Sequence, residues 1–121
     1  MKYLILLLFA SSIIFSQNFE AKIDVDDSSD DILIKGIFYN HSDFTINFSY
    51  EMISLKKGES GTSSTKQKGN FTAEPDEKVL LSEVFLNKDC SNYKIKLLIF
   101  DDIDVVTSDS VKLNFKNEGA N

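Results

Sequence analysis

Between Phe44 and Met52, apolar and polar residues alternate without a break. Phe44, Ile46, Phe48, Tyr50 and Met52 are separated by Thr45, Asn47, Ser49 and Glu51. Successive side chains of a β-strand point to opposite faces of the sheet, so this segment would have one apolar face and one polar face. A strand of this kind is typical of antiparallel sheets with one face in water. The segment therefore predicts an antiparallel strand that contributes to a hydrophobic core.

The rest of the chain repeats this pattern in short segments between polar turns. The further strands that we expect are 19–25, 32–39, 62–71, 78–86, 93–100 and 105–115. Seven strands with frequent turns predict an all-β fold, an immunoglobulin-like antiparallel β-sandwich. Trp is absent and Cys occurs once, so the Cys–Trp–Cys signature of antibody domains is missing. We expect the core to bring one set of side chains, Phe44, Ile46, Phe48 and Tyr50, against a second set, Ile95, Leu97 and Ile99.

Individual residues sharpen the prediction for four strands. Gly36 suggests a bulge in the second strand. Residues 62–71 are polar and contain two lysines, which predicts an edge strand. In the fifth strand we expect Leu80, Ser82, Val84 and Leu86 to share one face. The segment 93–100 is apolar on both faces at its end, which predicts a central strand. Tyr93 at its start is either a tyrosine corner or an ordinary strand tyrosine.

The first residues have the features of a secretion signal. Lys2 precedes an apolar run from Tyr3 to Phe15, and Ser16 supplies a small residue at the cleavage edge. The run is shorter than the roughly 20 residues of a comfortable membrane span, although an uncleaved anchor helix is the alternative. We expect a signal peptide over residues 1–16, a single domain over residues 17–121, no membrane span after cleavage, and a periplasmic or secreted location.

Charge and cysteine content exclude several classes of protein. The formal net charge is −6 and the chain has no Arg, so a nucleic-acid partner is not expected. Cys90 is the single cysteine, so no disulfide within the chain can form. Cys90 is therefore a small residue at a strand start, a free thiol or a link to another chain. The fold has to be stable through its core alone.

Catalytic and metal sites are not expected. His41 is the single histidine and lies in a predicted turn, and no G-x-S-x-G motif is present. One His and one Cys do not make a standard zinc site. The acidic pattern at 24–30 resembles the start of a calcium loop, but it lacks the Gly and the distal Glu, and residues 101–104 form a second acidic turn. We predict no enzyme activity, no metal and no cofactor, and interpret the turns as solvated.

Four lysines gather near one predicted hairpin of this acidic chain. Lys56 and Lys57 begin its predicted turn, which runs over residues 56–61, and Lys66 and Lys68 follow it. Local positive charge of this kind can steer an acidic partner. The alternative is a hairpin that lysines merely keep soluble. These four lysines are the candidate site for a client protein.

The chain also resembles a known family, the curli assembly chaperones of the CsgC and CsgH type, most clearly over residues 44–111. The resemblance is carried by residues 61–63 (GTS), 67–71 (QKGNF) and 81–87 (LSEVFLN), together with the strands that begin FTINFSY and YKIKLLIF. It implies a periplasmic immunoglobulin-like sandwich that binds curli subunits transiently and prevents premature amyloid formation without a cofactor. We expect a monomer, although the sequence does not determine the oligomeric state. Some members have a Cys-x-Cys pair, and this chain has Cys90 alone.

Two other classes remain open at this point. A secreted immunoglobulin-like adhesion or surface-binding module would have an exposed row of aromatic side chains or a calcium-dependent loop. A small hydrolase would need a pocket that brings His41 beside a Ser and an Asp. The sequence leaves the identity of the client subunit and the binding face undetermined.

Overall fold

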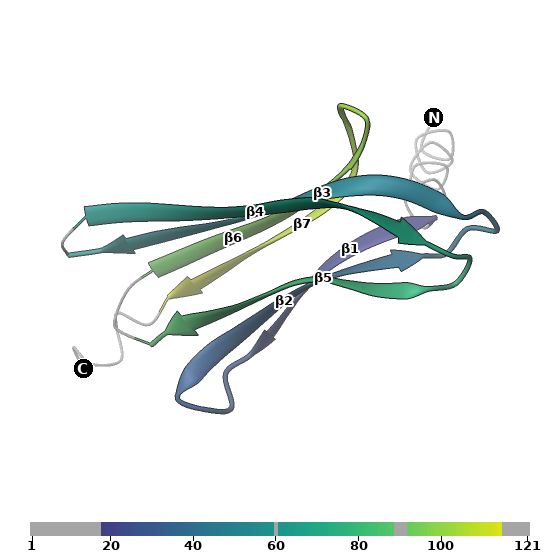
Figure 1. Cartoon of the computed structure of the whole chain (residues 1–121). Helices are drawn as coiled ribbons and strands as arrows, with labels where there is room; N and C mark the ends of the chain where they lie inside the picture. Colours follow the sequence, from purple (N-terminus) through teal and green to yellow (C-terminus); the bar gives the residue numbers. More distant parts are fainter. Residues whose placement is uncertain (1–17, 60, 89–91, 115–121) are drawn as a thin grey trace, which may run out of the picture.

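The computed structural model describes residues 18–59, 61–88 and 92–114, and these residues form two antiparallel sheets packed face to face (Figure 1). One sheet has three strands in the order β1-β2-β5, and the other has four in the order β4-β3-β6-β7. The strands are β1 (Phe19–Asp26), β2 (Asp31–Asn40), β3 (Ile46–Gly58), β4 (Gly61–Ala73), β5 (Lys78–Asn87), β6 (Asn92–Asp101) and β7 (Asp104–Asn114).

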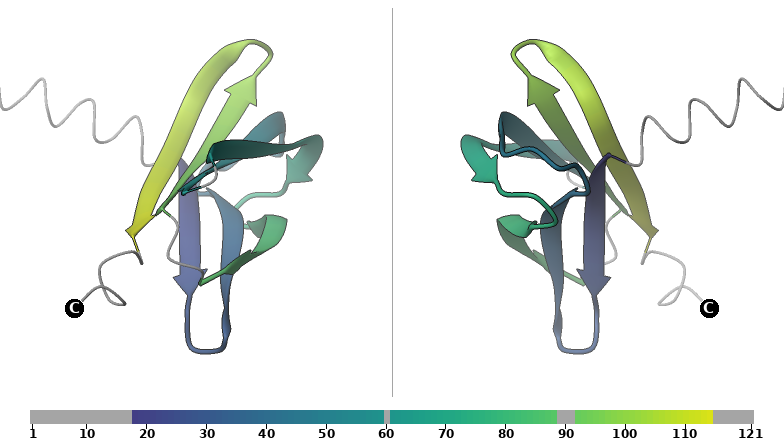
Figure 2. Two further views of the ribbon diagram at one scale, coloured as in Figure 1. Left: turned by 90° about the vertical axis from the view of Figure 1, so that its left-hand side faces the viewer. Right: turned by 90° about the vertical axis from the view of Figure 1, so that its right-hand side faces the viewer.

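This architecture confirms the predicted all-β sandwich of seven antiparallel strands. Figure 2 shows the two layers from the ends of the molecule, with the β6–β7 turn and the β1–β2 turn projecting on opposite sides. The fourth strand pairs with the third. In constant-type immunoglobulin domains it instead joins the sheet of the first, second and fifth strands. In the described part of the chain, no helix has the length and hydrophobicity needed to span a membrane.

The core lies between the inner faces of the two sheets. Residues of β6 and β2 supply its fully buried centre, including Ile95, Leu97, Ile99 and Phe38. The ring of Phe38 lies 5.0 Å from Phe71 and 6.0 Å from Phe48 between centroids, both edge-on. Ile46, Phe48 and Tyr50 of β3 are partly buried against this centre, as the alternation predicts. The central position of β6 and the edge position of β4 are likewise confirmed.

The prediction that Phe44 belongs to the core is wrong. Phe44 precedes β3 and its side chain is 73% exposed. Buried Asn40 holds this segment as a loop, because its amide donates to the carbonyl of Phe44 at 2.7 Å and its Oδ1 accepts from the Ser42 hydroxyl at 2.6 Å. These local hydrogen bonds compete with strand extension. The alternation of apolar residues therefore begins before the strand does.

The predicted face of β5 is wrong at Leu80, which is half exposed on the outer side. Between Gly36 and Ile37 the register with β5 shifts, since Gly36 pairs with Ser82 and Ile37 with Leu80. Leu81 is the extra residue of this bulge. Val79 and Leu81 point inward before the bulge, and Ser82 is the first inward residue after it. Gly36 does mark the bulge that the sequence suggests, but the added residue is on the partner strand.

Tyr93 at the start of β6 forms a tyrosine corner. Its ring is buried and its hydroxyl donates to the main-chain carbonyl of Asn87 at 2.9 Å, six residues upstream. This bond ties the connection between β5 and β6 to the core. The predicted signal peptide (1–16), Cys90 and Phe115 lie outside the described residues. The expectations for them remain predictions.

Candidate functional site

The outer face of the four-stranded sheet is defined by the register of β3. Met52 and Ser54 point into the sandwich, so Glu51, Ile53, Leu55 and Lys57 point outward. Residues directly opposite each other on paired strands lie on the same face. The outer-face partners of Ile53 are therefore Lys66 on β4 and Lys96 on β6.

The strand register places lysines from all four strands on this face. We define the lysine face by its members, which are Lys57, Lys66, Lys68, Lys94, Lys96 and Lys112. Apolar side chains lie among them, because Lys68 shares a row with Leu98, and Lys94 shares a row with Leu55. Among the described residues, Glu51 is the only acidic residue in these rows. A basic face with apolar interleaving thus stands on a chain whose formal net charge is −6.

Three of the four lysines singled out by the sequence are in this set. Lys57, Lys66 and Lys68 lie on the lysine face, and Lys56 lies on the opposite side of β3. The ammonium of Lys56 is 5.9 Å from the centroid of the Tyr93 ring, which is within range for a cation–π contact. The hairpin turn is also shorter than predicted, because Lys56 and Lys57 belong to β3.

Most of the positive charge on the lysine face is not neutralised by neighbouring acids. Lys66 Nζ lies 3.9 Å from Glu51 Oε1, and both side chains are partly in solvent. Within residues 18–59, 61–88 and 92–114, this is the one ion pair of the lysine face. Exposed ion pairs at such a distance contribute little to stability. The remaining ammonium groups are therefore available to an acidic partner.

A hollow lies at the end of this face nearest the β3–β4 hairpin. Its volume is about 340 Å³, and its lining includes the outward-facing residues Leu55, Lys57, Lys94 and Lys112. It therefore offers apolar surface beside positive charge. Such a surface suits a segment that has both carboxylates and apolar side chains.

Sequence reasoning missed Lys94, Lys96 and Lys112. The signal was present, because Lys94 and Lys96 alternate with the core residues Tyr93, Ile95 and Leu97. Alternation shows that they point away from the core, but it does not show which strands are neighbours. The strand order β4-β3-β6-β7 brings them beside the hairpin lysines.

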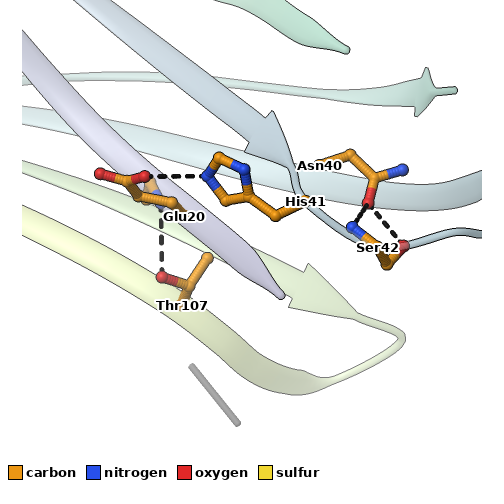
Figure 3. Close-up of polar contacts among 6 residues, drawn as sticks. Glu20, Asn40, His41, Ser42 and Thr107 are labelled. Carbon is orange, nitrogen blue, oxygen red and sulfur yellow. Dashed lines mark hydrogen bonds and ion pairs between the residues drawn. The ribbon is translucent and has the colours of Figure 1, made fainter. Parts of the chain in front are cut away.

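His41 lies on the three-stranded side of the molecule. Its Nε2 is 3.1 Å from Glu20 Oε1, and its ring stacks on Tyr39 with a centroid distance of 5.7 Å. Figure 3 shows that Ser42 faces Asn40 and not the imidazole. In the part of the chain that the structure describes, no Ser hydroxyl is hydrogen-bonded to His41. The arrangement does not assemble the nucleophile and base that a hydrolase requires.

The β1–β2 turn, where an acidic pattern suggested calcium, is held by its own hydrogen bonds. The Asp26 carboxylate accepts from the Ser28 hydroxyl at 2.7 Å and from the Ser28 amide at 3.0 Å. These two bonds lower the pKa of the Asp26 carboxyl below its ordinary value. Lys88 closes the turn by donating to the carbonyls of Asp27 and Ser29, each at 2.7 Å. Among the described residues, no three His, Cys, Asp or Glu side chains are grouped as metal ligands would be.

Comparison with known proteins places the chain in a family. The family model described as CsgH protein matches residues 20–110. The chain belongs to the CsgH family. The strands that form the lysine face lie almost entirely within the matched residues. No curated protein sequence matches the chain significantly.

Solved structures agree with the CsgH assignment at the level of the fold. The solution structure of R. palustris CsgH is 21% identical, with a TM-score of 0.58, and the match covers 82% of this chain and 94% of that protein. The E. coli curli protein CsgC is 19% identical, with a TM-score of 0.63 and coverage of 76% and 96%. A putative β-galactosidase from Bacteroides fragilis matches at 17% identity and a TM-score of 0.57 over 80% of this chain, but over only 17% of its own length. The enzyme therefore shares one sandwich domain with the chain, and the likeness is one of fold alone.

Proposed function

We propose that the mature chain is a periplasmic curli assembly chaperone that binds curli subunits transiently and delays their conversion to amyloid. The observation that carries the proposal is the lysine face on an acidic member of the CsgH family. Amyloid precursors expose strand edges and segments that form steric zippers. A small soluble domain that contacts these species briefly lowers the concentration of nuclei. Such an activity requires no ATP, metal or cofactor, and we infer that the chain is not an enzyme.

Electrostatics explains how a weak complex is selective. Positive charge spread over a sheet face speeds encounters with acidic segments and disfavours basic partners. The apolar side chains among the lysines add contact area once the partner has arrived. Exposed charges are screened over about 8 Å at physiological ionic strength, so the interaction weakens as salt rises.

The first experiment measures the lag time of thioflavin-monitored assembly of a purified curli subunit. The mature domain, at a molar amount far below that of the subunit, should lengthen the lag, and the effect should shrink as sodium chloride is raised. A lag that the domain does not change at low salt would reject the chaperone function. A delay that is independent of salt would retain the function and reject its electrostatic basis.

The periplasmic location depends on removal of residues 1–16. Mass spectrometry of the protein from the periplasmic fraction should give a chain that begins at Gln17. Recovery of the full-length chain in the membrane fraction would instead support an uncleaved anchor.

Among the described residues, no row of exposed aromatic side chains supports the alternative, an adhesion module. The exposed Phe rings of the described residues are Phe44, in the β2–β3 loop, and Phe85, on β5. Phe85 pairs with Leu33 near the start of β2 and Phe44 follows the end of that strand, so the two rings do not form a row. The surface that stands out in composition is the lysine face.

A further inference from the structure

A β-sandwich of two open sheets has four edge strands, and each exposes main-chain N–H and C=O groups that can pair with another chain. Here the edges are β1 and β5 of the three-stranded sheet and β4 and β7 of the four-stranded sheet. They are not equivalent. Their differences indicate where an added strand would bind.

The side of the sandwich between β1 and β7 is closed. The amide of Ile23 on β1 donates to the Asp109 carboxylate of β7 at 2.8 Å, and the amide of Ala21 donates to the Thr107 hydroxyl at 3.4 Å. Figure 3 includes the contact at Thr107. Side chains of one edge strand thus satisfy main-chain donors of the other. An incoming strand would have to displace them.

The side between β4 and β5 is open. Figure 1 shows that the two strands diverge from the turn that joins them. β5 is interrupted by its bulge at Leu81, and bulges distort an edge against pairing. β4 pairs with β3 without a register shift from Gly61 to Ala73. Its residues 61–66 are exposed whichever face they point to, so side chains of an added strand would have room on both faces.

The register also shows which amides of β4 are available. The hairpin closes at the pair Gly58 and Gly61, which exchanges ladder hydrogen bonds, and bonded and non-bonded pairs alternate from there. The amides of Ser64, Lys66 and Lys68 therefore point away from β3. Among the described residues, the main chain of Gly61–Asn70 has no hydrogen bond outside this ladder. A regular row of donors and acceptors faces solvent along β4.

We propose that β4 is a docking edge, to which an extended acidic segment of the curli subunit adds as a further strand of the four-stranded sheet. The inference rests on the proposed function and names its binding mode. Carboxylates at alternate positions of the segment lie opposite Lys66 and Lys68, and opposite charges across a strand pair are stabilising. A second copy of this chain is disfavoured as occupant, because its own Lys66 and Lys68 would approach these lysines. When a strand of the subunit pairs with β4, that edge of the subunit can no longer act as a template for further subunits.

Hydrogen exchange within β4 tests the docking mode directly. In the free mature protein, the amides of Ser64, Lys66 and Lys68 should exchange fast, and those of Ser63, Thr65 and Gln67 should be slower because they donate to β3. Addition of unlabelled curli subunit before nucleation should slow the first set at least about three-fold, which corresponds to one modest hydrogen bond per amide. Exchange in the first set that stays unchanged under conditions where the subunit is bound would overturn the proposal.

A matched pair of variants gives a second readout. Ser64→Pro removes an amide that faces solvent, which an edge strand tolerates, and Ser64→Ala keeps that amide while losing the same hydroxyl. Neither variant changes the charge. We expect the proline variant to need at least about three times more protein than the alanine variant for the same delay in lag time, because a strand hydrogen bond and close approach are lost.

The outcomes separate the two proposals. If the parent protein does not delay assembly, the proposed function fails. If the parent and both Ser64 variants delay assembly equally, the docking edge is wrong and the function stands. If sedimentation shows a dimer of the parent protein that Ser64→Pro abolishes, the edge binds a second copy and the proposal of an acidic segment is rejected. The exchange measurement on the parent protein remains decisive if Ser64→Pro does not fold.

Discussion

The two faces of the four-stranded sheet are built from the same strands and differ in almost every other respect. On the inner face, Ile95 and Leu97 of β6 are fully buried. On the outer face, one residue along the same strand, Lys94 and Lys96 are exposed beside lysines of the neighbouring strands. The inner face accounts for stability and the outer face for the proposed contact with curli subunits. Substitutions on one face should therefore leave the property of the other largely intact.

The largest expected effect is on the inner face. Leu97→Ala removes a fully buried side chain and should lower the free energy of unfolding by about 2–5 kcal/mol. Without a disulfide, this is a large share of the roughly 5–15 kcal/mol of a typical domain. Leu98→Ala, on the outer face, is the matched control and should cost much less. Urea denaturation measures both, and equal losses would contradict the assignment of the two faces.

Gly36→Ala tests how closely β2 of the three-stranded sheet approaches Met52 on the inner face of the four-stranded sheet. A Cβ at Gly36 would lie 2.9 Å from Met52 Sδ, too close for a normal contact. Because Met is flexible, we expect a cost near the low end of overpacking, about 1–2 kcal/mol. The cost should fall when Met52→Ala is made as well, as a double-mutant cycle of thermal unfolding would show. Equal costs in both backgrounds would mean that Met52 is not the obstacle.

Tyr93→Phe keeps the buried ring and removes the hydroxyl that donates to Asn87. The loss of one hydrogen bond to a partly buried carbonyl should cost about 0.5–1.5 kcal/mol. Chemical denaturation should show a lower midpoint with an unchanged slope. A variant as stable as the parent would indicate that the tyrosine corner does not stabilise the connection between β5 and β6.

The smallest effect on stability is expected on the outer face. The combined variant Lys68→Gln, Lys94→Gln and Lys96→Gln should change the free energy of unfolding by no more than about 0.5 kcal/mol per site. Lys94 lies directly opposite Lys112, and like charges in that position are destabilising, so its replacement should give a small gain. Thermal unfolding at low salt measures the sum. A loss comparable to that of Leu97→Ala would show that the lysines are part of the structure.

Much of this arrangement could be predicted from alternation alone. The pattern of Ile46, Phe48 and Tyr50 identified a strand and its inner face, and the apolar residues around Leu97 identified β6 as central. Alternation gave the wrong result where a local hydrogen bond or an extra residue interrupts the two-residue period of the strand. Asn40 holds Phe44 in a loop, and Leu81 forms a bulge that turns Leu80 outward.

The candidate site was less predictable because it depends on which strands are neighbours. The hairpin lysines are close in sequence, so Lys57, Lys66 and Lys68 could be found together. Lys94, Lys96 and Lys112 join them only through the pairing of β6 with β3 and β7. The amides exposed along β4 likewise follow from the register and not from composition.

The most direct test compares two variants of equal charge in the lag-time assay with a purified curli subunit. One replaces Lys68, Lys94 and Lys96 with Gln on the lysine face. The other replaces Lys22, Lys35 and Lys78 with Gln on the outer side of the three-stranded sheet, where acidic residues such as Glu20 and Glu83 are interspersed. If the lysine face binds the subunit, the first variant should lose most of the delay and the second should retain it, with both folded. Equal loss in the two variants would show that overall charge, and not this face, is responsible, and would contradict the central claim.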